Sequence, residues 1–271
     1  MPKYTRQIVV FLDVLGFSVM LPKFEKEALN HSNPEDGDYH ESESLNRLLT
    51  IFRDAINLIE ARNCNYYLFS DNICITINYI VEDTEYSGLF VDILQLINIL
   101  NYEFVKEGYF LRGGIDVGWF LDSRDIAAGM PLVNAYLLES KKAVYPRVLI
   151  SMDYVNIINA YKANNQFDDR QVFILDQILI SDDEQIFINY YLEVLNFEDP
   201  ASKIDFLKAY KERISYSLNL HKGVEKIFEK YRWSAERFNE FLGYYIRNIE
   251  TLEPELNEEG YLAKVETLKI N

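Results

Sequence analysis

Cysteine, positive charge and long hydrophobic runs are all scarce in this sequence, and each shortage excludes a class of protein. Only two cysteines occur, Cys64 and Cys74, without CxxC spacing or a neighbouring histidine, so neither a disulfide framework nor a zinc site is expected. Lysine and arginine total 27 against 43 acidic residues, a net charge of −16, which argues against nonspecific nucleic-acid binding. An anionic substrate would therefore need local help, such as a metal ion.

Membrane and common nucleotide-binding signatures are also missing. No apolar stretch is expected to reach the ~18 residues that a membrane helix requires. Residues 1–7 are polar and lead straight into a strand-like segment. We therefore expect a soluble cytoplasmic protein with no membrane partner. Neither GxxxxGK[ST] nor GxGxxG occurs, which disfavours P-loop and dinucleotide-binding chemistry.

The residues that build a packed interior are abundant. Apolar residues make up 49% of the sequence and aromatic residues 14%, including 20 Tyr and 17 Phe. A chain of 271 residues can hold one large domain, or one medium domain with an appendage.

Hydrophobic periodicity predicts an α+β domain over residues 1–181 and a helical extension over 182–271. Strands are expected at 8–14, 65–69, 73–78, 109–120 and 147–152, with an edge strand at 171–180, and helices at 44–62, 85–106 and 131–142. This order predicts a mainly antiparallel sheet with helices on one face. In the extension, Trp233 and Tyr244–Tyr245 are interpreted as helix packing or a subunit contact.

An acidic residue interrupts the first predicted strand. Asp13 lies in an otherwise apolar run that Gly16 ends. A carboxylate at a buried strand end costs roughly 2 to 7 kcal/mol unless it is paired or bound to a metal. For this residue alone, a structural role in the turn and a metal-binding role both stay open.

A second acid, Asp71, is expected at the tip of the hairpin formed by 65–69 and 73–78. Alone, an Asp at a hairpin tip usually belongs to the turn. Because the first strand is expected beside this hairpin, Asp13 and Asp71 can converge at one edge of the sheet. Together they can hold two divalent cations, Mg²⁺ or Mn²⁺, as two-metal phosphoryl chemistry needs.

Four segments resemble motifs of the class III nucleotidyl cyclases and occur in that family's order. Residues 11–18, FLDVLGFS, resemble the opening strand, and residues 67–72, YLFSDN, resemble the metal-binding hairpin. Residues 111–118, LRGGIDVG, resemble the glycine-bearing central strand, and Gly129 with the VNA of 133–135 resembles a segment whose Asn orients the substrate ribose. The similarity covers roughly residues 7–152 and implies a ferredoxin-like domain.

Within that superfamily the chain most resembles the pyrimidine nucleotide cyclases of bacterial anti-phage Pycsar systems. The residues that carry this are RGGI at 112–115, NAYLLE at 134–139 and PRVLI at 146–150.

The resemblance implies a role for each matching residue. Asp13 and Asp71 would bind the two metal ions, and Val14 would lend its backbone carbonyl. Asn134 would orient the ribose and Arg112 would contact phosphate. The paired glycines after Arg112, at 113–114, would let a ligand approach the backbone closely.

Two positions depart from the family pattern. Leu138 stands where mammalian-type enzymes have Arg, so the transition-state charge would be met by Arg112, Lys141, Lys142 or a partner subunit. Tyr67 stands where purine cyclases commonly place Lys or Glu, and an aromatic hydroxyl there favours a smaller pyrimidine base, uridine first. A further base-binding candidate, Asp125, lies one residue too far from Gly129 for the family spacing.

Taken together, these residues predict a cyclase that converts UTP or CTP to 3′,5′-cyclic UMP or CMP and pyrophosphate, as a second messenger in anti-phage defence. The resemblance also implies a head-to-tail homodimer with sites at its interface, and a separate effector protein that binds the product. Three alternatives stay open: a purine cyclase, a nucleotide-binding regulatory domain without catalysis, and a dimeric scaffold for a basic partner.

Overall fold

The computed structural model describes residues 3–30, 41–80, 86–123, 126–182, 184–256 and 259–270. The strands are β1 Tyr4–Val14, β2 Asn65–Phe69, β3 Asn72–Asn78, β4 Leu111–Asp122, β5 Ala127–Gly129, β6 Val148–Ile150, β7 Leu179–Asp182 and β8 Gln185–Ile188. The helices are α1 Phe17–Asn30, α2 Glu43–Glu60, α3 Ser87–Lys106, α4 Met130–Leu137, α5 Met152–Ala163, α6 Asp169–Ile178, α7 Pro200–Leu220, α8 Glu225–Arg247, α9 Ile249–Leu252 and α10 Glu259–Glu266. A π-helical turn, Leu138–Lys142, continues α4, and 3₁₀ turns occupy Tyr190–Asn196 and Pro254–Leu256.

The sheet has the order β2-β3-β1-β4-β6-β8-β7, in which β1 is an interior strand, with β5 paired to β4. β1 pairs antiparallel with β3 on one side and with β4 on the other, and only the β4–β6 pair among the described strands is parallel. The first four strands and the helices between them follow the ferredoxin-like order β-α-β-β-α-β. The predicted α+β class is confirmed, and β1 is held on both sides.

Alternation along β1 divides the two faces of the sheet. Ile8, Val10 and Leu12 are fully buried in the main core, which α2 and α3 cover. Val9 and Phe11 belong to a separate cluster on the opposite face. Because successive strand side chains point to opposite faces, Asp13 lies on the face of Val9 and Phe11.

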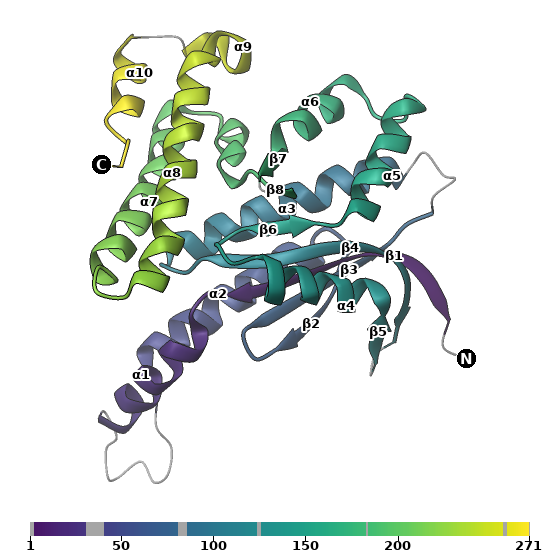
Figure 1. Ribbon diagram of the computed structural model, residues 1–271, viewed down its shortest axis with the longest axis horizontal. Helices are drawn as coiled ribbons and strands as arrows, with labels where there is room; N and C mark the ends of the chain where they lie inside the picture. Colours follow the sequence, from purple (N-terminus) through teal and green to yellow (C-terminus); the bar gives the residue numbers. More distant parts are fainter. Residues whose placement is uncertain are drawn as a thin grey trace.

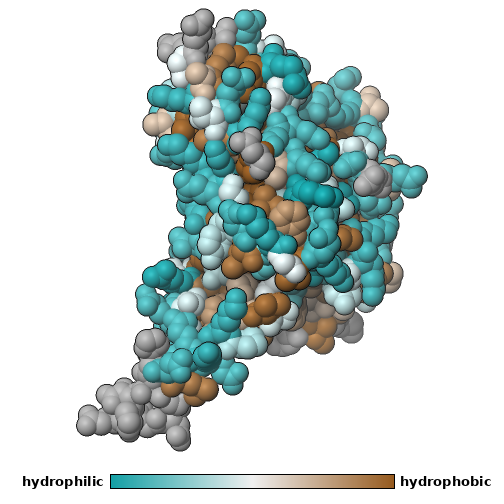
Figure 2. Space-filling view, turned by 60° about the vertical axis from the view of Figure 1, so that its left-hand side comes forward, coloured by the Kyte–Doolittle hydropathy of each residue, from teal (hydrophilic) through white to brown (hydrophobic). Residues whose placement is uncertain are grey.

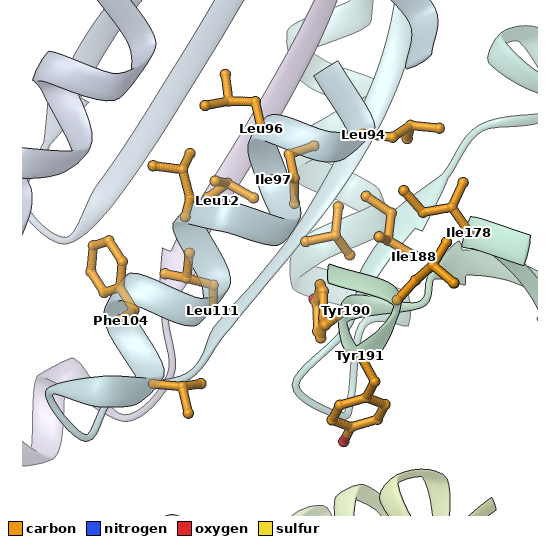
Figure 3. Packing of buried hydrophobic residues seen from close by; sticks show 14 of the residues in the cluster. Leu12, Leu94, Leu96, Ile97, Phe104, Leu111, Ile178, Ile188, Tyr190 and Tyr191 are labelled. Carbon is orange, nitrogen blue, oxygen red and sulfur yellow. The ribbon is translucent and has the colours of Figure 1, made fainter. Parts of the chain in front are cut away.

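Helix α3 is the central helix of the main core. By length and composition it could span a membrane, with a mean hydropathy of 1.3, so the expectation that no apolar stretch reaches that length is wrong. However, 61% of this window is buried within the fold. Figure 3 shows Ile97 and Phe104 of α3 lying close to Leu12 and Leu111 of the sheet. Its hydropathy is therefore explained by its position in the core of the fold.

The opposite face of the sheet carries α4 and the π-helical turn, packed over β1 and β4 (Figure 1). The contact is close at Gly114, where a β-carbon would lie 2.2 Å from the Ala135 carbonyl oxygen and 2.7 Å from Leu138 Cβ. The expectation that this glycine leaves room for a ligand is wrong, because α4 itself occupies the space.

The C-terminal region is helical, as expected, and is joined to the sheet. Phe238 and Leu242 of α8 belong to the same core cluster as α3. Residue 181 lies within β7, and β8 beyond it pairs with β6, so the sheet continues past the expected boundary. The division into two domains stays a prediction. Figure 2 shows hydrophilic residues over most of the face on this side, with smaller hydrophobic groups between them.

The segment predicted as an edge strand at 171–180 is mostly helix α6. Asp168 accepts from the Gln171 amide at 2.7 Å, and the Gln171 side chain accepts from the Asp168 amide at 3.1 Å. This capping box starts a helix, and it outweighs the β-branched residues that suggested a strand. The strand β7 follows α6. Helices α1 and α5 were not predicted, and α2 is capped by Ser42, just ahead of the predicted start.

Candidate functional site

Asp13 lies near the end of β1, opposite Asn72 of β3 and Arg112 of β4. The Arg112 Nε atom donates to Asp13 Oδ2 at 2.7 Å, and Arg112 Nη2 lies 2.7 Å from Glu139 Oε1. The side chains of Asp13, Arg112 and Glu139 are 13%, 25% and 4% exposed. The guanidinium of Arg112 therefore joins two largely buried carboxylates between the sheet and the π-helical turn.

Asp71 is held beside Asp13 by the turn between β2 and β3. Ser70 adopts a left-handed φ of 61°, and the Val14 amide donates to the Asp71 carbonyl oxygen at 3.3 Å. This backbone bond fixes the hairpin tip against the end of β1. The Asp71 side chain is near enough to Asp13 to contribute to the raised pKa of its carboxyl group. The structure brings the two predicted acids together, and their role as metal ligands stays a prediction.

Burial and crowding alter the acidity of these groups. Burial raises the pKa of Asp13; Arg112 opposes the rise and Asp71 adds to it. Burial also raises the pKa of Glu139 to about 7, again opposed by Arg112 and reinforced by Asp13 and Asp71. Three acids and one guanidinium leave an excess of negative charge, which a bound cation would offset.

The chemistry of this group fits a hard divalent cation. Asp13 and Asp71 offer carboxylate oxygens, the ligands that Mg²⁺ and Mn²⁺ prefer. Across the described ranges, no three Asp, Glu, His or Cys side chains form a ready-made metal site. Mg²⁺ commonly takes one or two carboxylates and completes its shell with water and phosphate oxygens, so two acids are sufficient.

Glu139 was missed in the sequence. Nothing in NAYLLE shows that this side chain turns inward, because its direction depends on the change from α-helix to π-helix at Leu138. Glu139 Oε1 has no well-aligned hydrogen bond, although Arg112 lies 2.7 Å away. Leu138 itself packs against an apolar cluster and brings no charge to the site. Lys141 and Lys142 are exposed.

Helix α8 brings an amine toward the same charges. Tyr231 packs on Phe110 with ring centroids 5.5 Å apart, and Trp233 joins the apolar cluster that contains Leu138. Lys230 directly precedes Tyr231 on α8. Burial lowers the pKa of Lys230, as does repulsion from Arg112 and Lys226, while Asp13 and Glu139 raise it. The local sequence gave no signal for this approach, because it depends on how α8 docks.

Asn134 lies on the same face of the sheet but is engaged elsewhere. Its amide donates to Asp116 Oδ2 at 2.8 Å. Asp116 is opposite Val9, four positions along β1 from Asp13 and so roughly 13 Å away at the usual strand rise. Burial raises the pKa of Asp116, against hydrogen bonds from Ser151 and Asn134. No contact among the described residues joins Asn134 to Asp13, Asp71 or Glu139.

Tyr67 belongs to a second polar group on β2, β3 and β4. Its hydroxyl donates to Asp122 Oδ1, while Asn65 and Thr76 donate to Asp122 Oδ2 at 3.0 and 2.9 Å. Burial alone would raise the pKa of Asp122, but these hydrogen bonds together hold it below its usual value. Burial is the main cause that raises the pKa of Tyr67, and Asp122 raises it further, so the hydroxyl stays protonated.

A cavity of about 430 Å³ opens beside this group, lined by Tyr66, Tyr67, Asp122 and Ser123 among others. Asp122 was missed in the sequence, where it reads as the polar end of a strand. The other base-binding candidate, Asp125, lies outside the described residues.

No protein-family model and no curated protein matches this chain. Among solved structures it is similar to the guanylyl cyclase Cya2, at 11% identity over 69% of this chain and 92% of that chain, with a TM-score of 0.42. It is similar to the adenylyl cyclase CyaB from P. aeruginosa at 16% identity, over 59% and 83% of the two chains, with a TM-score of 0.42. A guanylyl cyclase domain of the RhoGC fusion protein from the aquatic fungus Blastocladiella emersonii matches at 13%, over 68% and 94%, also with a TM-score of 0.42. At these values we argue function from the residues of the site alone.

Proposed function

We propose that this protein is a nucleotidyl cyclase that converts a nucleoside triphosphate to a 3′,5′-cyclic monophosphate and pyrophosphate. The observation that carries the proposal is the convergence of Asp13 and Asp71 at one edge of the sheet, against Arg112. Two Mg²⁺ or Mn²⁺ ions held there, with the Val14 carbonyl as a further ligand, would activate the ribose hydroxyl and neutralise the triphosphate.

In the proposed reaction, the ribose 3′ oxygen forms a bond to the α-phosphorus. The bond from that phosphorus to the bridging oxygen of the β-phosphate breaks, pyrophosphate leaves, and the hydroxyl proton passes to solvent. Arg112 exchanges its contact with Asp13 for a phosphate oxygen. Lys230 supplies positive charge that Leu138 cannot, and so offsets the charge that develops on pyrophosphate. Asn134 orients the ribose from α4.

For the base, we propose a pyrimidine, uracil or cytosine. The Tyr67 hydroxyl donates its hydrogen bond to Asp122, so its oxygen is left to accept a hydrogen bond from a base N–H. The bulk of the ring favours a small base. With the resemblance to Pycsar cyclases, this supports cyclic UMP or CMP as a cytoplasmic second messenger in anti-phage defence, acting on a separate effector protein.

We further propose that the enzyme works as a homodimer. Helix α4 exposes Met130, Val133, Tyr136 and Leu137, each between 42% and 64%, on the face that carries Asp13. At the hairpin tip, Phe69 is 49% exposed. Clustered exposed apolar side chains mark interaction surfaces, and a second copy would bury them. Light scattering during turnover tests this, and a strictly monomeric active enzyme contradicts it.

The deciding experiment is mass spectrometry of products after incubation of the protein with ATP, GTP, CTP and UTP separately, each with Mn²⁺. A cyclic pyrimidine nucleotide supports both the cyclase reaction and the choice of a pyrimidine base. A cyclic purine nucleotide keeps the reaction and discards the Tyr67 argument. Nucleotide binding without any product favours the inactive regulatory domain, which the replacement of Arg by Leu138 makes the second candidate.

A further inference from the structure

A second cavity, of about 400 Å³, lies between the β7–β8 hairpin and helix α8, away from the carboxylates. Its walls come from four parts of the chain: Arg147 before β6, residues 176–181 at the end of α6 and in β7, Asn189 and Tyr190 after β8, and Trp233 and Tyr244 of α8. Pockets that hold small organic ligands start at about 300 Å³, so the cavity is large enough for a nucleobase or a nucleoside.

One wall includes the flat side chains of Arg147, Phe187 and Trp233, which pack on one another and on Tyr145 outside the lining. The Trp233 and Tyr145 rings are parallel within 3° and 4.9 Å apart, and Phe187 lies 5.6 Å from Trp233. The Arg147 guanidinium lies over all three rings, at 5.2 to 5.5 Å from their centroids. Arg147 is 4% exposed. A wall of stacked planar groups is preorganised for a planar ligand.

Buried polar atoms of three lining residues lack well-aligned hydrogen bonds among the described residues: Oδ1 of Asn189, the hydroxyl of Tyr190 and Nε of Arg237. The Asn189 and Tyr190 side chains are 8% and 7% exposed, and the Tyr190 oxygen is near the Val148 backbone, so its O–H is the group that remains without an acceptor. The other end of the Asn189 amide is fixed, because Nδ2 donates to the Gln177 carbonyl oxygen at 3.4 Å. An unmet buried acceptor or donor costs about 1 to 3 kcal/mol, and a ligand group that satisfies it recovers that cost.

The chemistry of these atoms defines the complementary group. Asn189 Oδ1 can only accept, so it needs an N–H donor, and the Tyr190 hydroxyl can donate to a carbonyl oxygen or ring nitrogen. We propose that this cavity binds a planar heteroaromatic molecule with both an N–H and an acceptor on its edge, the pattern of a nucleobase or nucleoside. The site is separate from Tyr67, and its existence does not depend on the proposed cyclase reaction.

Contacts from the cavity wall reach the carboxylate group. Trp233 packs in the same apolar cluster as Leu138, the residue before Glu139. The Arg147 carbonyl oxygen accepts from the Gly113 amide at 3.1 Å, next to Arg112. Trp233 and Arg147 therefore connect the cavity wall to both partners of the Arg112–Glu139 ion pair.

Tryptophan fluorescence tests the proposal. The chain has two tryptophans, and Trp119 is exposed on β4, so Trp119→Phe leaves Trp233 as the only one. This protein is titrated separately with uracil, cytosine, adenine and guanine and with their nucleosides. A saturable change in Trp233 emission is expected for at least one of them, at least tenfold weaker in Asn189→Leu and in Ser181→Phe, which fills the cavity wall.

The controls separate this site from the substrate site. Binding should be unchanged in Tyr67→Phe, and product assays play no part in the readout. If Asn189→Leu fails to fold, Ser181→Phe decides alone, because residue 181 is exposed. No saturable change with any of the eight probes overturns the proposal. So does binding that both cavity variants leave intact, because the ligand would then lie elsewhere.

Discussion

Arg112 lies directly opposite Asp13 in the β1–β4 ladder, and its Nε atom donates to Asp13 Oδ2 at 2.7 Å. A buried carboxylate is rarely left without a partner, and here the partner is the Arg112 guanidinium on the neighbouring strand β4. A cation that binds Asp13 must either share this carboxylate with the Arg112 guanidinium or displace the guanidinium from it. Metal binding to Asp13 and the conformation of Arg112 are therefore linked, so a change in either one affects the other.

Asp13→Asn and Asp71→Asn should each abolish turnover, by at least a hundredfold, because each removes a charge from the proposed metal ligands. The fold should survive, since Asn is close in size and Arg112 keeps Glu139. Asp54→Asn, at an exposed position of α2, is the matched control. Product formation and circular dichroism are measured on all three. Full activity in either site variant contradicts the metal assignment.

Lys230→Gln should lower kcat/KM roughly tenfold, about 1.4 kcal/mol of transition-state stabilisation, with most of the loss in kcat. Lys230→Arg should restore part of it. Lys226→Gln is the control, because Lys226 lies one turn earlier on α8 and is exposed. Equal effects of the two Gln variants would show that only the overall charge of α8 matters.

Tyr67→Ala should raise the ratio of purine to pyrimidine turnover by about tenfold, because it enlarges the space next to the base. Asp122→Asn should weaken turnover of pyrimidine nucleotides but change that ratio less. This substitution leaves the Tyr67 ring in place and alters only the hydrogen bond of the Tyr67 hydroxyl. Competition assays with equimolar UTP and ATP report the ratio. A ratio unchanged by Tyr67→Ala removes Tyr67 from the base site.

Glu193 gives a pH dependence away from the carboxylates. Burial raises its pKa to about 7, against a hydrogen bond from Asn196 and the charge of Arg62. Below the ordinary pKa of the carboxyl, both folded and unfolded chains hold its proton. As pH rises toward 7, the unfolded chain loses the proton first, so the free energy of unfolding falls by about 2 to 3 kcal/mol. Urea titrations of Glu193→Gln should lack this fall.

Gly114→Ala should destabilise the protein by about 3 kcal/mol, because the new methyl group would lie 2.2 Å from the Ala135 carbonyl oxygen and force α4 away from β4. Gly223→Ala, where a β-carbon meets nothing within 4 Å, should be close to neutral. Thermal unfolding compares the two. Similar melting temperatures would mean that α4 is not packed against the strand as described.

The sequence predicted what local patterns encode. The apolar run around Asp13, the turn at Asp71 and the helical spacing of α3 predicted the α+β class and the mainly antiparallel sheet, while the ferredoxin-like arrangement was implied by the family resemblance. Residues whose role depends on docking were missed. Glu139 faces inward only because a π-helical turn follows α4. Asp122 belongs to the proposed base site because it accepts a hydrogen bond from Tyr67. Lys230 interacts with the carboxylates only because α8 docks beside them. At 171–180, the side-chain types suggested a strand, but the capping box at Asp168 starts helix α6 there.

The interior position of β1 in the sheet has a consequence for synthesis of the chain. β1 is made before its ladder partners β3 and β4, and α8 is made later still. Until β4 emerges, the apolar side chains of β1 have only part of their packing, and Asp13 has no Arg112. The carboxylate group therefore forms only after Glu139 has been made, and Lys230 follows later on α8. A product of translation interrupted before β4 would lack Arg112 and would be exposed to aggregation through an unpaired edge of β1.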